Sequence, residues 1–301
     1  MANNKPRVKK HSFFKTLLWL LVLAAAAYLL YIFFLGPSLI PSRDAAREQG
    51  MIVSDDSFNL LLVGSDYTQL AAGAPRADTI ILANVRPATQ QLFLLSIPRD
   101  SLVEIEGYGS DKINHSFAYG GMELLTDTVE RNLQVPVDYY LLTDFGGFES
   151  IIDALGGVEI NVDKRMYYHT YDGLIDIEAG LQLLDGEKAL QYVRYRHDEL
   201  GDITRVSRQQ NLLKALYAKL SEPGIYRKLP QILPRLFEAV DTDMSKALIV
   251  RAAIAMKDAP AESVEAATLA GDFANIDGVS YWRLDEAAGQ QMLLRYFGAQ
   301  E

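Results

Sequence analysis

The sequence predicts an α/β (α+β) fold, in which a central mixed or largely antiparallel β-sheet is flanked by helices and preceded by one N-terminal transmembrane helix. Three observations support this prediction. Apolar, β-branched runs follow one another across short connections between residues 58 and 97. Helical and strand patterns then alternate along the middle of the chain. A run without any charged residue precedes all of these elements, at Leu17–Leu35.

The uncharged run Leu17–Leu35 is long enough to cross about 30 Å of hydrocarbon as one helix. The residues before it include five basic and no acidic side chains, so the positive-inside rule places the N-terminus in the cytoplasm. A cleaved signal peptide is the alternative, but the run exceeds the usual apolar core of a signal. We therefore expect a single-pass protein of the cell membrane, with a cytoplasmic tail at 1–16, a transmembrane helix at 17–35, a stalk at 36–56 and an extracytoplasmic body.

The chain has a formal net charge of -10, and the part beyond residue 40 is more acidic still, because the N-terminal segment carries only positive charges. Such a body repels polyanions, so we expect no binding to nucleic acid. The sequence contains no cysteine and therefore offers no disulfide and no thiolate ligand. Any anionic substrate must be held by locally gathered arginines.

The first three strands are expected at Phe58–Val63, Thr79–Val85 and Gln91–Ile97. If they form an antiparallel meander, Asp66 and Asp78 lie at one edge of the sheet, and Arg99 emerges there as well. Arg76 lies in the loop beside them. Two such carboxylates repel each other unless a cation lies between them, and oxygen ligands favour Mg²⁺ or Mn²⁺. The alternative is that each aspartate is a turn or cap residue.

Helices and strands then alternate. Helices are expected at Met122–Leu133, Phe145–Leu155, Asp185–Leu190, Leu229–Val240 and Lys246–Met256. Strands are expected at Val137–Leu142, Val158–Val162, Tyr192–Arg196, Val264–Leu269 and Ser280–Leu284. Asp144 is expected to cap the second helix, and Gly156 and Gly157 to end it. Residues 221–301 are predicted to be a C-terminal helical and strand part packed on the same body.

Four arginines gather within this acidic chain, at Arg194, Arg196, Arg205 and Arg208. The first two have strand spacing and should point to one side, and the others should lie on the first turns of a helix from Asp202 to about Leu220. Arginine suits phosphate because its planar fork donates two parallel hydrogen bonds and keeps its proton. The stretch therefore indicates an anion site, with a solvated basic rim as the alternative.

Several short motifs resemble those of the LytR-CpsA-Psr family, in that family's order, over roughly residues 57–220. They are Asn59–Asp66, Arg76–Thr79, Ser96–Asp100, Asp111–His115, Leu184–Leu190 and the arginine stretch. Members of that family are membrane-anchored, extracytoplasmic phosphotransferases. They move a glycopolymer, such as teichoic acid or capsule, from polyprenyl pyrophosphate to peptidoglycan. The resemblance implies a magnesium-dependent transferase of cell wall biogenesis, with residues 57–220 as its catalytic domain.

The resemblance also implies roles for single residues. Mg²⁺ or Mn²⁺ is expected at Asp66 and Asp78. The pyrophosphate-binding arginines are expected to be Arg76, Arg99, Arg194 and Arg196. Further substrate contacts are expected from Lys112, Arg205 and Gln210. Asp100 and Asp198 are the two candidates for the base that accepts the proton of the acceptor hydroxyl. Tyr67 and Thr68 follow Asp66 where the commoner form has Asp-Ser-Arg, so one further arginine is missing.

Two other classes of function stay open. The chain could be a pyrophosphatase of the same lipid, with water in place of the sugar hydroxyl, or a non-catalytic module that binds carrier lipid or wall polymer. A polyprenyl tail would need an apolar pocket, which the sheet and Phe145–Leu155 could line. His115, His169 and His197 are interpreted as surface or structural residues, and none has a metal-ligand spacing to another. The alternative for His197, which neighbours Asp198, is a proton shuttle.

Overall fold

The computed structural model describes residues 56–66, 74–170, 173–197, 202–222 and 224–298. The predicted cytoplasmic tail, transmembrane helix and nearly all of the stalk therefore lie outside the described residues. No helix within these ranges has the length and apolar character needed to cross a bilayer.

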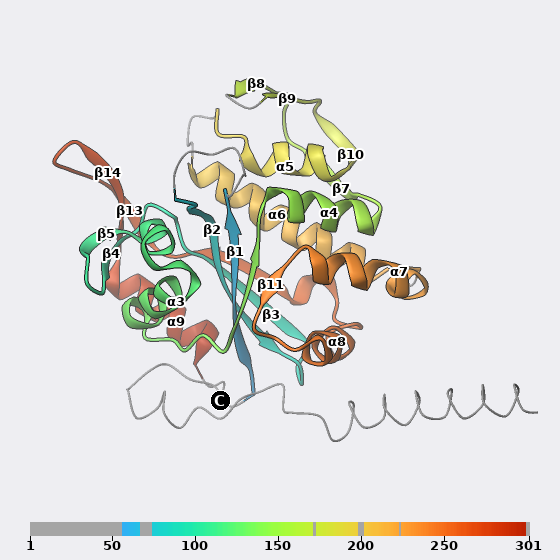
Figure 1. The fold of residues 1–301 in the computed structure, drawn as a ribbon, viewed down its shortest axis with the longest axis horizontal. Coiled ribbons are helices and arrows are strands. Elements are labelled where there is room, and N and C mark those ends of the chain that lie inside the picture. Colours follow the sequence, from blue (N-terminus) through green and yellow to red (C-terminus); the bar gives the residue numbers. More distant parts are fainter. Residues whose placement is uncertain (1–55, 67–73, 171–172, 198–201, 223, 299–301) are drawn as a thin grey trace, which may run out of the picture.

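A six-stranded mixed sheet forms the centre of the molecule, in the order β11-β6-β1-β2-β3-β12 (Figure 1). The expected antiparallel meander is confirmed as β1 (Phe58–Ser65), β2 (Ala77–Arg86) and β3 (Gln91–Ser96). β6 (Tyr139–Thr143) lies parallel to β1, and β12 (Val264–Thr268) lies parallel to β3. The short strand β11 (Asp241–Thr242) adds to the outer edge of β6. Both outer strands thus come from the last part of the chain.

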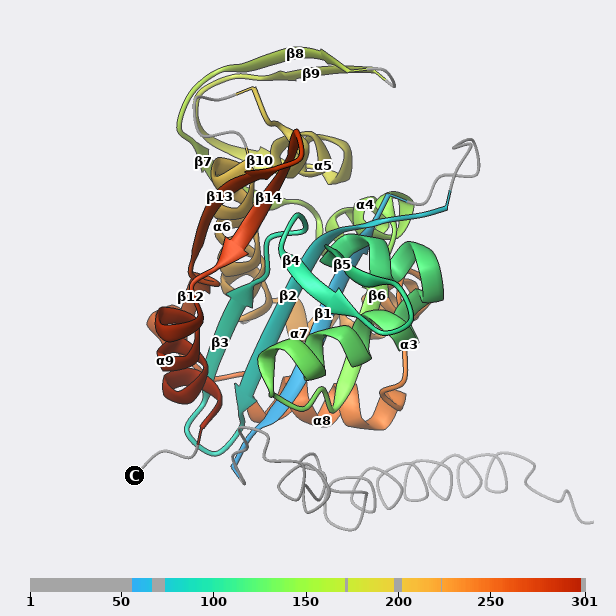
Figure 2. The same ribbon diagram turned by 90° about the vertical axis from the view of Figure 1, so that its left-hand side faces the viewer.

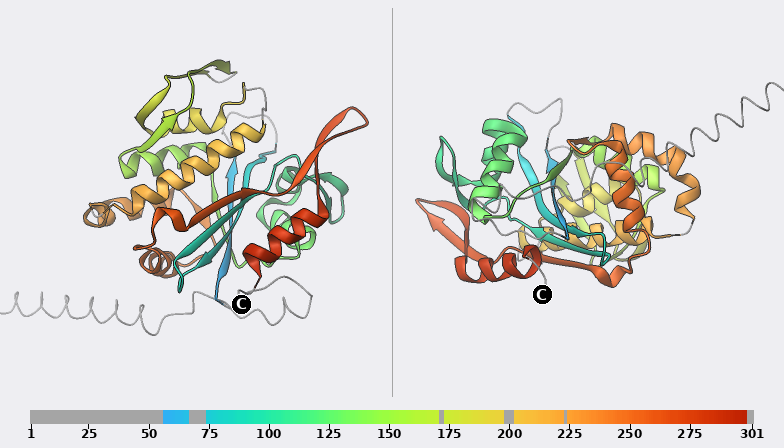
Figure 3. Two further views of the ribbon diagram at one scale, coloured as in Figure 1. Left: turned by 180° about the vertical axis from the view of Figure 1, so that it is seen from behind. Right: turned by 90° about the horizontal axis from the view of Figure 1, so that it is seen from below.

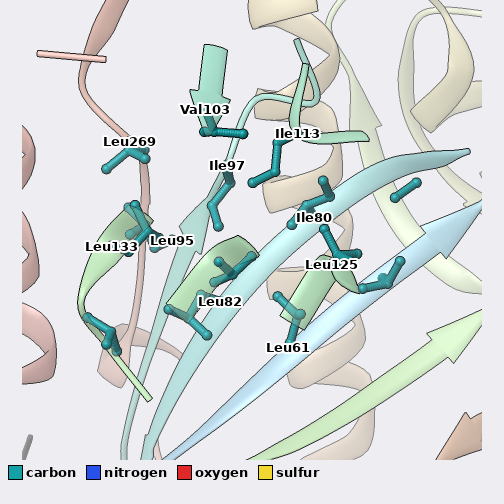
Figure 4. Close-up of a cluster of buried hydrophobic side chains, with 14 of the residues drawn as sticks. Leu61, Ile80, Leu82, Leu95, Ile97, Val103, Ile113, Leu125, Leu133 and Leu269 are labelled. Atoms are coloured by element: carbon teal, nitrogen blue, oxygen red, sulfur yellow. The ribbon is translucent and has the colours of Figure 1, made fainter. Parts of the chain in front are cut away.

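Helices cover both faces of this sheet, as Figures 1 and 3 show. One face carries α3 (Ile113–Leu133) and α9 (Glu286–Phe297). The other side carries α4 (Phe145–Leu155), α5 (Gly186–Arg194), α6 (Asp202–Leu220), α7 (Ile225–Glu238), α8 (Lys246–Ala255) and the short 3₁₀ helix η1 (Ala261–Ser263). The main core lies between the sheet and α3, where Leu61, Leu95 and Leu125 are fully buried (Figure 4). Strand residues alternate between the two faces, which is why both layers can be apolar.

Four two-stranded ribbons surround the sheet (Figure 2). They are β4 (Leu102–Ile105) with β5 (Gly109–Lys112), β7 (Val158–Val162) with β10 (Gly180–Leu184), β8 (Met166–Thr170) with β9 (Gly173–Ile177), and β13 (Gly271–Ile276) with β14 (Val279–Leu284). The β13–β14 ribbon projects from the body in Figure 3. Only the strands now seen as β7 and β14 had been expected from the sequence, because the other ribbon strands alternate weakly between apolar and polar residues.

Two expectations need correction. Tyr192–Arg196 is not a strand: α5 continues to Arg194, and Tyr195 then adopts an extended conformation. The Asp185 side chain caps α5, and Leu190 and Val193 bury one face of the helix, so the helical period prevails over the strand-like spacing of the arginines. The helix expected from Met122 is confirmed, but α3 also contains an earlier segment from Ile113, separated from it by non-helical backbone at Gly120 and Gly121.

A buried polar network joins the end of the chain to the sheet. Arg86 on β2 is 5% exposed, and its guanidinium donates hydrogen bonds to Asn84 Oδ1 at 2.9 Å and to the Gly298 carbonyl at 3.0 Å. Asn84 in turn donates to Asn59 Oδ1 at 2.8 Å. The end of α9 is therefore held by the same strand that begins at the candidate site.

Candidate active site

The end of β1, the start of β2 and the segment after β3 meet at one edge of the sheet. Arg99 forms an ion pair with Asp78, and these side chains are 19% and 24% exposed. The Arg76 backbone N–H donates to Asp66 Oδ1 at 2.6 Å, and the Asp66 N–H donates to the Arg76 carbonyl at 3.1 Å. The convergence of these four residues, which the meander predicted, is confirmed.

A β-bulge lies next to Asp66. The pairing of β1 with β2 shifts register between Gly64 and Ser65. Gly64 also packs closely on β2, since a Cβ on it would lie 3.2 Å from the Cβ of Thr79. A bulge bends a strand and changes the direction of its side chains. Gly64 pairs with Thr79 and Ser65 pairs with Ala77, so the extra residue is Asp78, and the regular alternation of β2 is interrupted at this aspartate, which shares a cavity with Asp66.

This cavity has a volume of about 490 Å³ and lies between the sheet and helices α4, α5 and α6. Its charged lining residues are Asp66, Arg76, Asp78, Arg99, Asp144, Arg194, Arg196 and Arg205. Its apolar lining residues include Leu62, Ile81, Leu141, Phe148, Ile151, Leu190, Leu212, Leu213 and Leu216. The expectation that the sheet and α4 line an apolar pocket is confirmed.

The two kinds of lining residue occupy different ends of the cavity. Along β2 the lining changes from Asp78 to Ile81, and along α6 it changes from Arg205 to Leu216. β1 runs antiparallel to β2 and shows the reverse order along the chain, from apolar to charged. The cavity therefore has a charged end, rich in arginine, at the edge of the sheet, and an apolar end.

Neighbouring side chains hold the arginines of α5 and α6 in place. The Arg194 guanidinium lies 4.6 Å from the ring centroid of Phe145, a cation–π contact. Arg208 is 3% exposed, donates to the Tyr195 carbonyl at 3.0 Å and lies 5.2 Å from the centroid of the Tyr195 ring. Since Tyr195 separates Arg194 from Arg196, Arg208 fixes the segment that carries both. Sequence reasoning assigned Arg208 to the arginine stretch but not to the site.

Three other predicted residues, Asp100, Lys112 and Gln210, lie outside this cavity. Asp100 pairs with Lys112 at 2.8 Å, and Arg99 Nε lies 3.6 Å from the other Asp100 oxygen. Neither Asp100 nor Lys112 lines the cavity. The Gln210 amide donates to Ser96 Oγ at 3.0 Å and to the backbone of β12, so it ties α6 to the sheet. Asp198 lies outside the described residues.

Gln209, one position before Gln210, lines the cavity instead. It donates to Thr79 Oγ1 at 2.9 Å. Adjacent helix residues differ by about 100° around the axis, so their directions depend on how α6 packs. No signal in the sequence distinguishes the two glutamines.

The carboxylates of Asp66 and Asp78 suit a divalent ion that is also coordinated by substrate phosphate. The described residues include no group of three or more acidic or histidine side chains placed to bind a metal. Arg99 already supplies positive charge to Asp78, and Asp66 Oδ1 accepts the Arg76 N–H. Mg²⁺ commonly binds through one or two carboxylates and takes its other ligands from water and substrate phosphates. Asp66 and Asp78 fit that pattern better than they fit an all-protein cage.

A second cavity, of about 760 Å³, shares Ser65, Thr143 and Asp144 with the first. Four acidic side chains line it, and Arg235 is the one basic side chain among the described residues that line it. Although it is larger, it contains none of the residues that were predicted to form the site, and the arginine-lined cavity is therefore the candidate active site.

Comparison with known proteins identifies the family of this chain. The model described as the LytR_cpsA_psr family matches residues 41–296. The chain belongs to the LytR-CpsA-Psr family. Polyisoprenyl-teichoic acid--peptidoglycan teichoic acid transferase TagU of Bacillus subtilis is 32% identical over 297 residues, which cover 95% of each chain. Probable cell wall biosynthesis protein LcpB of Corynebacterium glutamicum is 37% identical over 234 residues, 73% of this chain, and the match spans only 56% of LcpB.

Solved structures of the LytR-CpsA-Psr family share this fold. The crystal structure of B. subtilis TagV superposes with a TM-score of 0.71 at 25% identity, over 82% of this chain and 99% of TagV. TagT bound to LIIa-WTA superposes with a TM-score of 0.66 at 29% identity, over 80% of this chain and 91% of TagT. The predicted mixed sheet flanked by helices is thus the family's architecture.

Proposed function

We propose that this protein is an extracytoplasmic phosphotransferase that moves an anionic glycopolymer, such as teichoic acid or capsule, from polyprenyl pyrophosphate to a sugar hydroxyl of peptidoglycan. The supporting observation is a cavity with five arginines at one end and leucine and isoleucine side chains at the other. A lipid pyrophosphate has the same division between a charged head and an apolar tail. The name of TagU and the complex of TagT with LIIa-WTA support the same class of substrate.

In the proposed reaction, the acceptor hydroxyl attacks the phosphorus that carries the polymer. The bridging P–O bond then breaks, and polyprenyl phosphate leaves with the electron pair. Negative charge grows on the phosphate oxygens, and arginines that are already in place stabilise it without reorganising. Asp78 holds Arg99, and Phe145 holds Arg194, so these two side chains are prepared for that role.

Asp66 and Asp78 are the residues that would hold Mg²⁺, which would supply further positive charge to the pyrophosphate. The apolar end would take up the prenyl tail, at about 0.8 kcal/mol for each buried CH₂ group. An anchor at residues 17–35 would keep the cavity close to the carrier lipid in the membrane.

The test is product analysis with the full-length protein in detergent. It is incubated with a short lipid-pyrophosphate-linked saccharide, a peptidoglycan oligosaccharide and Mg²⁺, and the products are identified by mass spectrometry. We expect a phosphodiester-linked glycan and free polyprenyl phosphate. Release of saccharide phosphate without any linked glycan would identify a pyrophosphatase. Tight binding of a donor that stays intact would identify a non-catalytic binding module.

A further inference from the structure

A second group of polar and aromatic side chains lies on the β4–β5 ribbon and the first turns of α3. It consists of Tyr108, Asp111, His115 and Tyr119, hereafter the Asp111 cluster. Asp111 Oδ2 lies 2.8 Å from His115 Nδ1 and accepts a hydrogen bond from the Tyr119 hydroxyl at 2.8 Å. Asp111 Oδ1 accepts from the Lys112 N–H at 2.7 Å. No residue of this cluster has a part in the reaction described above.

The contacts of Asp111 determine which nitrogen of His115 carries the proton. Burial raises the pKa of Asp111, but hydrogen bonds from His115, Tyr119 and the Lys112 N–H outweigh that effect, and the pKa is lowered. An ionised carboxylate can only accept, so the proton of this contact belongs to Nδ1 of His115. In the neutral ring Nε2 is then an acceptor. The His115 side chain is 27% exposed, and Asp111 is its hydrogen-bond partner within the described ranges.

The tyrosines of the cluster form an exposed aromatic surface. The rings of Tyr108 and Tyr119 are stacked, with centroids 4.3 Å apart and an interplanar angle of 11°. They are 56% and 43% exposed, although large aromatic rings are usually mostly buried. An aromatic face with a polar tip suits a sugar ring, which offers C–H groups on its face and hydroxyls at its edge.

The Asp111 cluster borders the charged end of the cavity. The Asn114 N–H, next to His115, donates to the Arg99 carbonyl at 3.2 Å. The hydrogen bond to Asp111 raises the pKa of the Tyr119 hydroxyl, and the nearby charge of Arg76 acts in the opposite direction. Arg76 and Arg99 both line the cavity. A sugar on the tyrosine pair would therefore lie beside the proposed pyrophosphate site.

We infer that the Asp111 cluster is the acceptor subsite, in which the stacked tyrosines bind a neutral, hydroxyl-bearing glycan and His115 Nε2 accepts the proton of the attacking hydroxyl. This inference rests on the proposed function. As the new O–P bond forms and polyprenyl phosphate leaves, the proton passes from the hydroxyl to Nε2 and then to solvent. Asp111 orients the ring and stabilises the imidazolium, as the aspartate does in an Asp–His pair of a hydrolase. Asp100, in contrast, already pairs with Lys112 and Arg99.

The test separates acceptor binding from donor binding in the transfer assay. Tyr108→Ala should raise the acceptor KM by about two- to tenfold and leave the donor KM unchanged. His115→Gln should lower kcat by about 10²–10⁴-fold, while the donor still binds as in the parent protein. Tyr167→Ala is the matched control, because Tyr167 is a 51% exposed tyrosine on β8 outside the cluster, and it should change neither constant.

The results distinguish a failure of the proposed function from a failure of the acceptor subsite. If the parent protein forms no linked glycan with any acceptor, the proposed function fails. If the parent transfers and both Tyr108→Ala and His115→Gln keep its acceptor KM and kcat, the inference alone is wrong. The inference would also be wrong if Arg235→Gln raised the acceptor KM while Tyr108→Ala left it unchanged. That result would place the glycan in the second cavity, which Arg235 lines. Tyr108 lies in the exposed turn between β4 and β5, so its replacement should not prevent folding.

Discussion

Replacing Asp78 by asparagine removes one negative charge from the cavity and keeps the shape of the side chain. The side chains of Asp78 and its partner Arg99 are 24% and 19% exposed, so this ion pair is intermediate between a surface pair and a buried pair. Surface pairs contribute about 0–1 kcal/mol, and breaking a buried pair costs about 3–5 kcal/mol. Asparagine can still accept a hydrogen bond from Arg99, so we expect the free energy of unfolding to fall by about 1 kcal/mol. For a domain of this size that change lowers Tm by about 2–4 °C.

The effect on transfer should be much larger than the effect on stability. Asp78 is one of two carboxylates proposed to hold Mg²⁺, and replacing even an outer-shell partner of a metal ligand commonly lowers metal affinity by about 10–100-fold. The Mg²⁺ concentration that gives half-maximal transfer should rise by that factor in Asp78→Asn. The assay titrates Mg²⁺ against the rate of product formation, and thermal unfolding of the same preparations reports stability.

Asp176→Asn is the control for this experiment, because Asp176 pairs with Arg165 at 3.1 Å outside the cavity. It should leave the Mg²⁺ requirement unchanged. Full transfer by the parent protein in the presence of a chelator would remove the metal from the mechanism. A parental Mg²⁺ requirement in Asp78→Asn would show that this aspartate serves Arg99 alone.

Three further predictions address the arginines, the apolar end and the topology. Arg196→Lys keeps the charge but loses the planar guanidinium, which can donate two parallel hydrogen bonds. Each lost charge-assisted hydrogen bond is worth about 1.5–3 kcal/mol, so the transfer rate should fall roughly ten- to a hundredfold while Tm stays unchanged. A transfer rate equal to that of the parent protein would contradict an anion site at Arg196. Leu216→Glu places a carboxylate at the apolar end of the cavity, so it should raise the KM of a long-chain donor and leave the affinity for inorganic pyrophosphate unchanged. An unchanged KM would mean that the prenyl tail binds elsewhere. Protease added to intact spheroplasts should digest the bulk of the chain, and a fully protected C-terminus would refute the predicted topology.

Local sequence signals were sufficient for the elements that build the charged edge. The β-branched runs of the meander and the turn between β2 and β3 fix the direction of each strand, so the approach of Asp66, Asp78 and Arg99 follows from chain connectivity. The ends of α4 are equally local. Asp144 accepts a hydrogen bond from the Gly147 N–H at 2.7 Å, and Gly156 adopts the left-handed conformation that ends the helix.

The remaining features depend on packing that a pattern does not contain. Residues 192–196 are compatible with a strand period and with a helix period, and the Asp185 cap together with burial of Leu190 and Val193 favours the helix as far as Arg194. The choice between Gln209 and Gln210 depends on the rotation of α6 against the sheet. Within the Asp111 cluster, Asp111, His115 and Tyr119 are four residues apart along the chain, but the stack of Tyr108 on Tyr119 requires the β4–β5 ribbon to lie against α3, which no short-range signal predicts.

The origin of the outer strands has a consequence for synthesis of the chain. Ribosomes make the protein from its N-terminus, so β6 and β3 are complete well before their outer partners, β11 at residue 241 and β12 at residue 264, exist. During that interval both sides of the nascent sheet present unpaired N–H and C=O groups, which can pair with another chain. A chain that stops before residue 241 would keep both edges open permanently and should therefore aggregate, even though it contains every residue of the arginine-lined cavity.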